Sequence, residues 1–140
     1  MKAQGFTRET IREIGVTERN FPKVAIGDVV AISQRIVEGD KSRLQVFEGD
    51  VIAISNNGAS STFTVRKIGA DAVAVERIFP FYSPVIEGLQ VVRKGKVRRA
   101  KLYYMRKRVG KRARVEEMVM TREQREQRAA SRGTNKEAAL

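Results

Sequence analysis

The chain has 140 residues, of which 41% are hydrophobic, and its 28 Lys and Arg exceed its 16 Asp and Glu to give a net charge of +12. This length fits one small domain with a modest core. The absence of Cys excludes disulfides and thiolate metal sites, and the absence of His removes the commonest general base and metal ligand. We therefore expect a protein that is not an enzyme and uses no cofactor, no metal and no small-molecule substrate.

The first 20 residues are predicted to form a short helical arm. Thr7 and Thr10 can each cap a helix near residues 8–14. This stretch lacks the apolar segment of a secretory signal, and no apolar run in the chain approaches the 18 or so residues that span a bilayer. We expect a cytoplasmic protein with no membrane partner.

Seven short runs of apolar and β-branched residues follow, joined by residues typical of turns. They occupy residues 29–37, 42–47, 51–55, 61–68, 72–78, 89–92 and 97–105. Short strands joined by tight turns favour a mainly β fold, and we expect a small antiparallel barrel over residues 21–117. Residues 118–140 are predicted to be a polar tail, partly helical and partly disordered.

All of the net charge lies in residues 93–114, which hold 12 Lys and Arg and no acid. A linear array of cations is best neutralised by a polymer of phosphates, so nucleic acid is the expected partner. A solvated face without a partner is the alternative. The residues expected to bind RNA are Arg93, Lys94, Lys96, Arg98, Arg99, Lys101, Tyr103, Arg106, Lys107, Arg108, Lys111, Arg112 and Arg114.

Within this basic segment, the alternation over 97–105 predicts a strand that points Arg99 and Lys101 outward beside Tyr103. That ring could stack on a base, although ordinary packing of Tyr103 is equally compatible with the pattern. Residues 105–114 contain too few apolar residues for core, so we expect a mobile extension laid along phosphates.

Glu48 and Asp50 lie two residues apart, as a magnesium or acid-base pair would require. Because no third acid or His lies nearby, they are better interpreted as turn and surface residues. No phosphate-cradling glycine motif occurs in the chain.

Several blocks together resemble one protein family. They are GKVRRAKLYYMR (95–106), GKRARVEE (110–117), EGDKSRLQVFEG (38–49), FEGDVI (47–52), TFTVRKI (62–68) and ERIFPFYSP (76–84). Their sequence and order closely resemble ribosomal protein nineteen of the bacterial large subunit. Met105, Asp50, Ala72 and Ala74 depart from the usual family residues, and none of the basic positions is affected.

This resemblance implies an SH3-like barrel and a structural role in the large ribosomal subunit. It further implies binding to ribosomal RNA at the face that meets the small subunit, support of the aminoacyl-tRNA site region and a contribution to an intersubunit bridge. The implied partners are large-subunit RNA, small-subunit RNA across the interface, and neighbouring proteins such as the third and fourteenth of the large subunit.

Two other functions are compatible with the residues alone. One is a barrel-type RNA-binding factor that joins the transcription or translation machinery transiently. The other is a nuclease or RNA-modifying enzyme, which would require Glu48 and Asp50 to act together.

Overall fold

The computed structural model describes residues 19–119, 121 and 122. The predicted helix at 8–14 and nearly all of the predicted tail lie outside the described residues. In the described part of the chain, no helix is long and apolar enough to cross a membrane.

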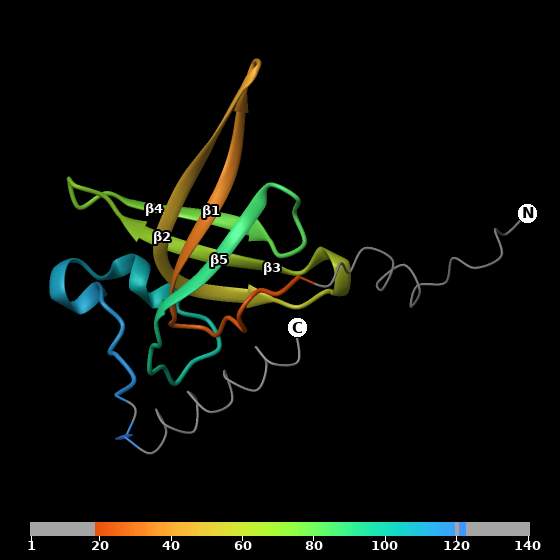
Figure 1. Ribbon diagram of the computed structural model, residues 1–140. Coiled ribbons are helices and arrows are strands. Elements are labelled where there is room, and N and C mark those ends of the chain that lie inside the picture. The colour runs from red at the N-terminus through yellow and green to blue at the C-terminus, as the bar shows by residue number, and fades with distance from the viewer. Residues whose placement is uncertain (1–18, 120, 123–140) are drawn as a thin grey trace, which may run out of the picture.

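The protein is built on one antiparallel sheet of five strands in the order β4-β3-β2-β1-β5 (Figure 1). The strands are β1 (Val29–Glu38), β2 (Lys41–Ser55), β3 (Thr62–Ile68), β4 (Ala74–Pro80) and β5 (Ile86–Arg93). Three short 3-10 helices complete the described elements: η1 (Gly58–Ser60), η2 (Tyr103–Lys107) and η3 (Gly110–Ala113). The β1–β2 hairpin projects beyond the other strands, and the chain that follows β5 lies far from the tip of this hairpin (Figure 1).

The prediction of a mainly β, antiparallel fold is confirmed, but the sheet does not close into a barrel. The described residues of β4 and β5 form the two edges of the sheet and do not pair with each other. The runs 42–47 and 51–55 are one strand, because residues 48–50 stay extended and pair with β1. A register irregularity between Val51 and Ala53 then bends β2 as it passes from β1 to β3.

The predicted strand at 97–105 is wrong. Residues 97–102 are irregular, and the helix η2 begins at Tyr103. The two buried residues of this stretch, Leu102 and Met105, are three apart, which places them on one side of a 3-10 helix. The alternation along residues 97–104 that predicted a strand therefore does not correspond to the burial of these residues.

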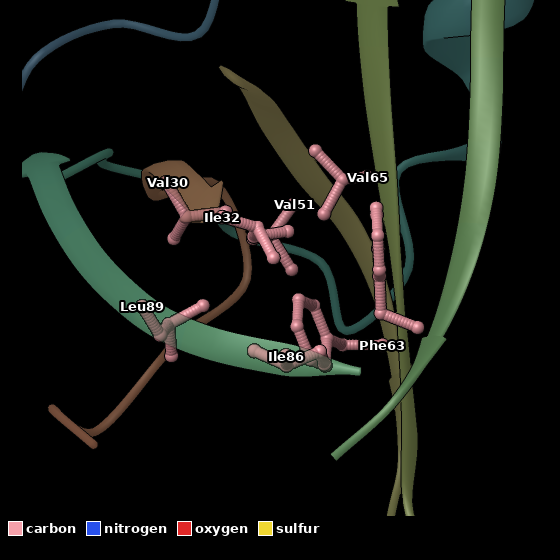
Figure 2. Close-up of a cluster of buried hydrophobic side chains, with 8 residues drawn as sticks. Val30, Ile32, Val51, Phe63, Val65, Ile86 and Leu89 are labelled. Carbon is pink, nitrogen blue, oxygen red and sulfur yellow. The ribbon is translucent and has the colours of Figure 1, made fainter. Parts of the chain in front are cut away.

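One face of the sheet holds the main hydrophobic core (Figure 2). Its buried residues are Val30, Ile32, Val51, Phe63, Val65, Phe79, Ile86 and Leu89. Phe63 stacks on Phe79 with ring centroids 5.6 Å apart. Alternate residues of β1 and β3 enter this core, as their period-two pattern predicts.

A second, smaller cluster joins the basic segment to the sheet. It contains Ile52 and Ala53 of β2 together with Leu102 and Met105. Val51 is in the main core and Ile52 is in this cluster, so β2 is covered on both faces here. The continuous apolar run at 51–54 is typical of such a strand.

Candidate nucleic-acid interface

Backbone hydrogen bonds join the start of the basic segment to the residues that follow its end. The amide of Lys96 donates to the carbonyl of Glu116 at 2.8 Å, and the amide of Met118 donates to the carbonyl of Lys94 at 2.9 Å. Gly95 and Glu117 form an isolated antiparallel bridge between these bonds. Residues 96–116 therefore form a closed loop, which we call the basic loop.

A buried carboxylate anchors the start of this loop. The side chain of Asp28 is only 1% exposed, and its Oδ2 lies 2.6 Å from Lys94 Nζ. The amides of Ala25 and Gly95 also donate to this carboxylate, at 3.1 and 3.3 Å. Lys94 was predicted to bind RNA, but the structure shows that its ammonium group is held by Asp28.

Gly95 makes a close backbone crossing possible at the same place. A Cβ at Gly95 would collide with the carbonyl oxygen of Gly27, which itself has a φ of +86°. A side chain at Gly95 would require movement of the backbone, and one at Gly27 would be strained by the positive φ and would collide with Val97. Gly27 and Gly95 therefore mark a point of close contact between segments that are distant in the sequence.

The basic loop contacts the sheet at a few points, and residues 105–114, predicted as an extension, include most of the short helix η2 and the helix η3. The amide of Leu102 donates to the carbonyl of Ile52 at 2.8 Å, and the Leu102 side chain is fully buried. Met105 in η2 and Ala113 in η3 are also buried. These few apolar residues fix the path of a loop whose remaining side chains are mostly charged and exposed.

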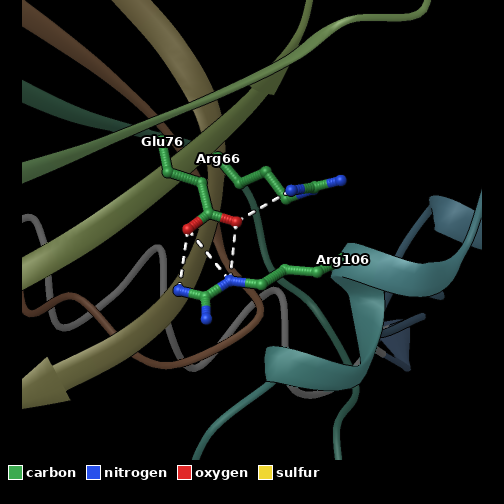
Figure 3. Close-up of polar contacts among 3 residues, drawn as sticks. All are labelled: Arg66, Glu76 and Arg106. Carbon is green, nitrogen blue, oxygen red and sulfur yellow. Dashed lines mark hydrogen bonds and ion pairs between the residues drawn. The ribbon is translucent and has the colours of Figure 1, made fainter.

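Glu76 of β4 holds η2 through two arginines (Figure 3). Its Oε2 lies 2.8 Å from Arg106 Nη2, and its Oε1 lies 2.8 Å from Arg66 Nη1. Arg106 Nε also donates to both carboxylate oxygens, at 3.0 and 3.1 Å. The bonds from Arg106 lower the pKa of Glu76 against the opposing effect of burial, and Arg66 lowers it further. Arg106, predicted to bind RNA, thus fixes η2 to the sheet.

The remaining cations of the basic loop are displayed outward. Among the residues that the structure describes, none of them forms an ion pair. These exposed cations are Lys96, Arg98, Arg99, Lys101, Lys107, Arg108, Lys111, Arg112 and Arg114. Arg93, at the end of β5, is partly buried.

Two adjacent tyrosines lie among these cations. Tyr103 is 44% exposed, as the sequence suggests, and Lys101 and Arg106 lie 5.9 and 4.6 Å from its ring centroid. Tyr104 is not among the residues that the sequence predicts to bind RNA. It is in fact half-buried, and the guanidinium groups of Arg99 and Arg108 both lie over its ring. The flanking arginines were visible in the sequence, but the fold of the loop was not.

Glu48 and Asp50 both line one hollow of about 390 Å³, beside Arg66, Arg93 and Arg114. In the described part of the chain, no third acid joins them to form a group that could hold a metal ion. Asp50 Oδ1 is buried and accepts no hydrogen bond from a described residue. Burial raises the pKa of Asp50, and the charges of Arg93 and Arg114 only partly oppose this effect.

Replacing Asp50 by Asn is expected to raise the free energy of unfolding by about 1 kcal/mol at pH 7, because a buried acceptor then loses its charge. A raised carboxyl pKa means that the folded state binds the proton more tightly than the unfolded state does. The loss of folding stability caused by the Asp50 carboxylate is therefore absent below about pH 4 and appears as the pH rises through the raised pKa. Urea unfolding at pH 7 and pH 3.5 measures the gain, which should shrink at the lower pH.

Glu48→Gln is the matched control, since Glu48 is exposed on the same strand. An equal gain from both substitutions would mean that net charge, and not the burial of Asp50, is responsible.

The fold and the site together define a class: a small antiparallel β protein that carries a preformed and densely cationic loop. The family model described as ribosomal protein L19 matches residues 7–118. This match covers most of the chain, including the whole sheet and the basic loop.

Curated relatives agree with that match. The large ribosomal subunit protein bL19 of Sulfurovum sp. (strain NBC37-1) is 50% identical over 110 residues, which cover 79% of this chain and 92% of that protein. The protein of the same name from Clostridium botulinum strain Hall is 56% identical over 100 residues, covering 71% and 87%. That from Wolinella succinogenes is 46% identical over 110 residues, covering 79% and 93%.

The chain therefore belongs to the ribosomal protein L19 family, a family of structural proteins of the large ribosomal subunit. The resemblance identified in the sequence is confirmed. The prediction that the protein is not an enzyme is confirmed by the same finding, and the nuclease alternative is wrong.

Proposed function

We propose that this chain is a structural constituent of the large ribosomal subunit that binds ribosomal RNA through the exposed cations of the basic loop. The observation that carries the proposal is their arrangement on a folded loop without ion-pair partners among the described residues. Unpaired cations at fixed spacing neutralise phosphates without first losing an internal partner.

The surface favours phosphate contact over the reading of base sequence. Arginines supply forked donors that suit phosphate oxygens, and lysines supply point charges. In the described chain, no helix of more than one or two turns is present to enter a groove. The RNA is therefore recognised chiefly by its backbone and shape.

Family membership supports a finer proposal about position. We place the protein at the face of the large subunit that meets the small subunit, where it supports the aminoacyl-tRNA site region and contributes to an intersubunit bridge. Its neighbours would be other large-subunit proteins and, across the interface, small-subunit RNA.

The salt dependence of RNA binding tests this function. Substituting Arg98, Arg99 and Lys101 together by Gln should reduce the slope of log affinity against log salt by roughly 2 to 3, because each phosphate contact contributes about 0.7 to 0.9. Fluorescence anisotropy with a large-subunit RNA fragment measures this slope. Lys41, Arg43 and Arg77, which are exposed on the strands, provide a control triple substitution with the same change in charge.

An equal reduction by both triple substitutions would contradict the assignment of binding to the basic loop. Sedimentation of salt-washed subunits tests residence separately. A structural constituent stays in the particle, whereas a transient factor is released.

A further inference from the structure

A hollow of about 480 Å³ lies in the basic loop, between the chain that leaves β5 and the chain that returns from η2 and η3. Its walls are Lys96, Val97, Arg98, Arg99, Tyr104, Arg108 and Glu116. This volume is in the range of sites that take a small organic molecule or one unit of a polymer.

The backbone around the hollow and the ring of Tyr104 are held by the contacts that fold the loop. The backbone bond from Lys96 to Glu116 joins the two sides. Tyr104 packs against the second hydrophobic cluster, beside the buried Leu102 and Met105. The hollow is therefore present before any ligand arrives, and a ligand pays little to shape it.

The chemistry of the walls combines positive charge with flat surfaces. Four side chains are cationic and one is a carboxylate, and the four cations form no ion pair with described residues. The guanidinium carbons of Arg99 and Arg108 lie 5.4 and 4.6 Å from the centroid of the Tyr104 ring. A guanidinium group held over a ring presents its own plane as a stacking surface.

One class of ligand matches both properties. A nucleotide carries a phosphate for the cations and a planar base for the stacked groups, whereas an acidic peptide would meet only the charges. The bases of a regular duplex are stacked inside it and cannot reach such a hollow, so the nucleotide must be unpaired. Glu116 adds an acceptor that can take a 2′-hydroxyl or a base N–H.

We propose that this hollow captures one unstacked nucleotide of the bound RNA, with its phosphate on the cationic wall and its base against the guanidinium groups that flank Tyr104. The inference rests on the proposed function and adds a preference for RNA that offers a bulged or unpaired nucleotide. The remaining exposed cations should bind paired and bulged stems equally well, because both kinds of stem present phosphates.

The test compares two RNA hairpins with the same stem, one fully paired and one carrying a single bulged adenosine. The full-length protein should prefer the bulged hairpin by roughly 5- to 100-fold, as expected for one stacked base. The double variant Arg99→Gln, Arg108→Gln should lose that preference. The matched variant Lys101→Gln, Arg112→Gln removes the same charge from the same loop outside the hollow, and should weaken binding to both hairpins equally.

A direct readout uses the protein's three tyrosines, Tyr82, Tyr103 and Tyr104, whose ring signals are few enough to assign by NMR. The signals of Tyr104 should shift with the bulged hairpin and not with the paired one. Equal affinity for the two hairpins, or loss of the preference in both double variants, would overturn the hollow as a nucleotide site and leave the proposed function standing. Failure of the protein to bind either hairpin in a salt-dependent way would overturn both.

Discussion

Replacing Leu102 by Ala is expected to lower the free energy of unfolding by about 3 kcal/mol, the usual cost of a large cavity in a core. Leu102 is fully buried and belongs to the cluster that joins the basic loop to β2. The substitution changes no charge, yet it should also weaken RNA binding by roughly 2- to 10-fold, because a loosened loop must be ordered on binding. Urea unfolding and fluorescence anisotropy measure the two effects.

Leu44→Ala is the control, since Leu44 is 58% exposed on the β1–β2 hairpin and undergoes the same chemical change. It should alter neither quantity by much. If Leu102→Ala reduced stability but left RNA affinity as it was, the packing of the loop would not contribute to binding.

Replacing Asp28 by Ala is also expected to cost about 3 kcal/mol of stability, because the change leaves two backbone amides without their acceptor and Lys94 without its partner. Amide exchange at Gly95 and Lys96 should accelerate, since these residues lie where the basic loop begins. Thermal unfolding and exchange measured on the same samples report both effects.

Asp71→Ala serves as the control because it makes the same change in net charge at an exposed turn. Asp28→Asn, which keeps an acceptor for the amides, should fall between Asp28→Ala and the wild type. Equal unfolding midpoints for Asp28→Ala and Asp71→Ala would show that the buried carboxylate has no structural role.

The strands were predicted well from the sequence where burial alternates along the chain. Val30 and Ile32 of β1 enter the core, and the turn at residues 39–40 separates β1 from β2 as its Gly-Asp pair indicates. The break expected near Gly49 does not exist. A Cβ there would collide with the carbonyl of Arg66, so this glycine permits close packing inside a continuous strand.

The sequence reveals the charge of the basic segment, but it does not predict the conformation of that segment well. Its charge is a property of the residues themselves, so the sequence reveals it directly. The roles of Lys94 and Arg106 could not be predicted, because their partners Asp28 and Glu76 lie 66 and 30 residues away in the sequence. Local patterns carry no information about such long-range pairs, so structural and free cations look alike in the sequence.

The residues that hold the basic loop come before it in the sequence, and this order affects how the protein folds. Three of the four strand pairs join strands that are neighbours in the sequence, and only the pairing of β1 with β5 closes a long stretch of chain. Asp28, Ile52 and Glu76, which hold the basic loop, all precede it and are therefore synthesised first. We expect the sheet to form without the loop but the loop not to form without the sheet, because contacts close in sequence form earliest. We therefore expect the cations to reach their final spacing in the last stage of folding, so that a newly made chain first displays them on a flexible segment and only later on a shaped surface.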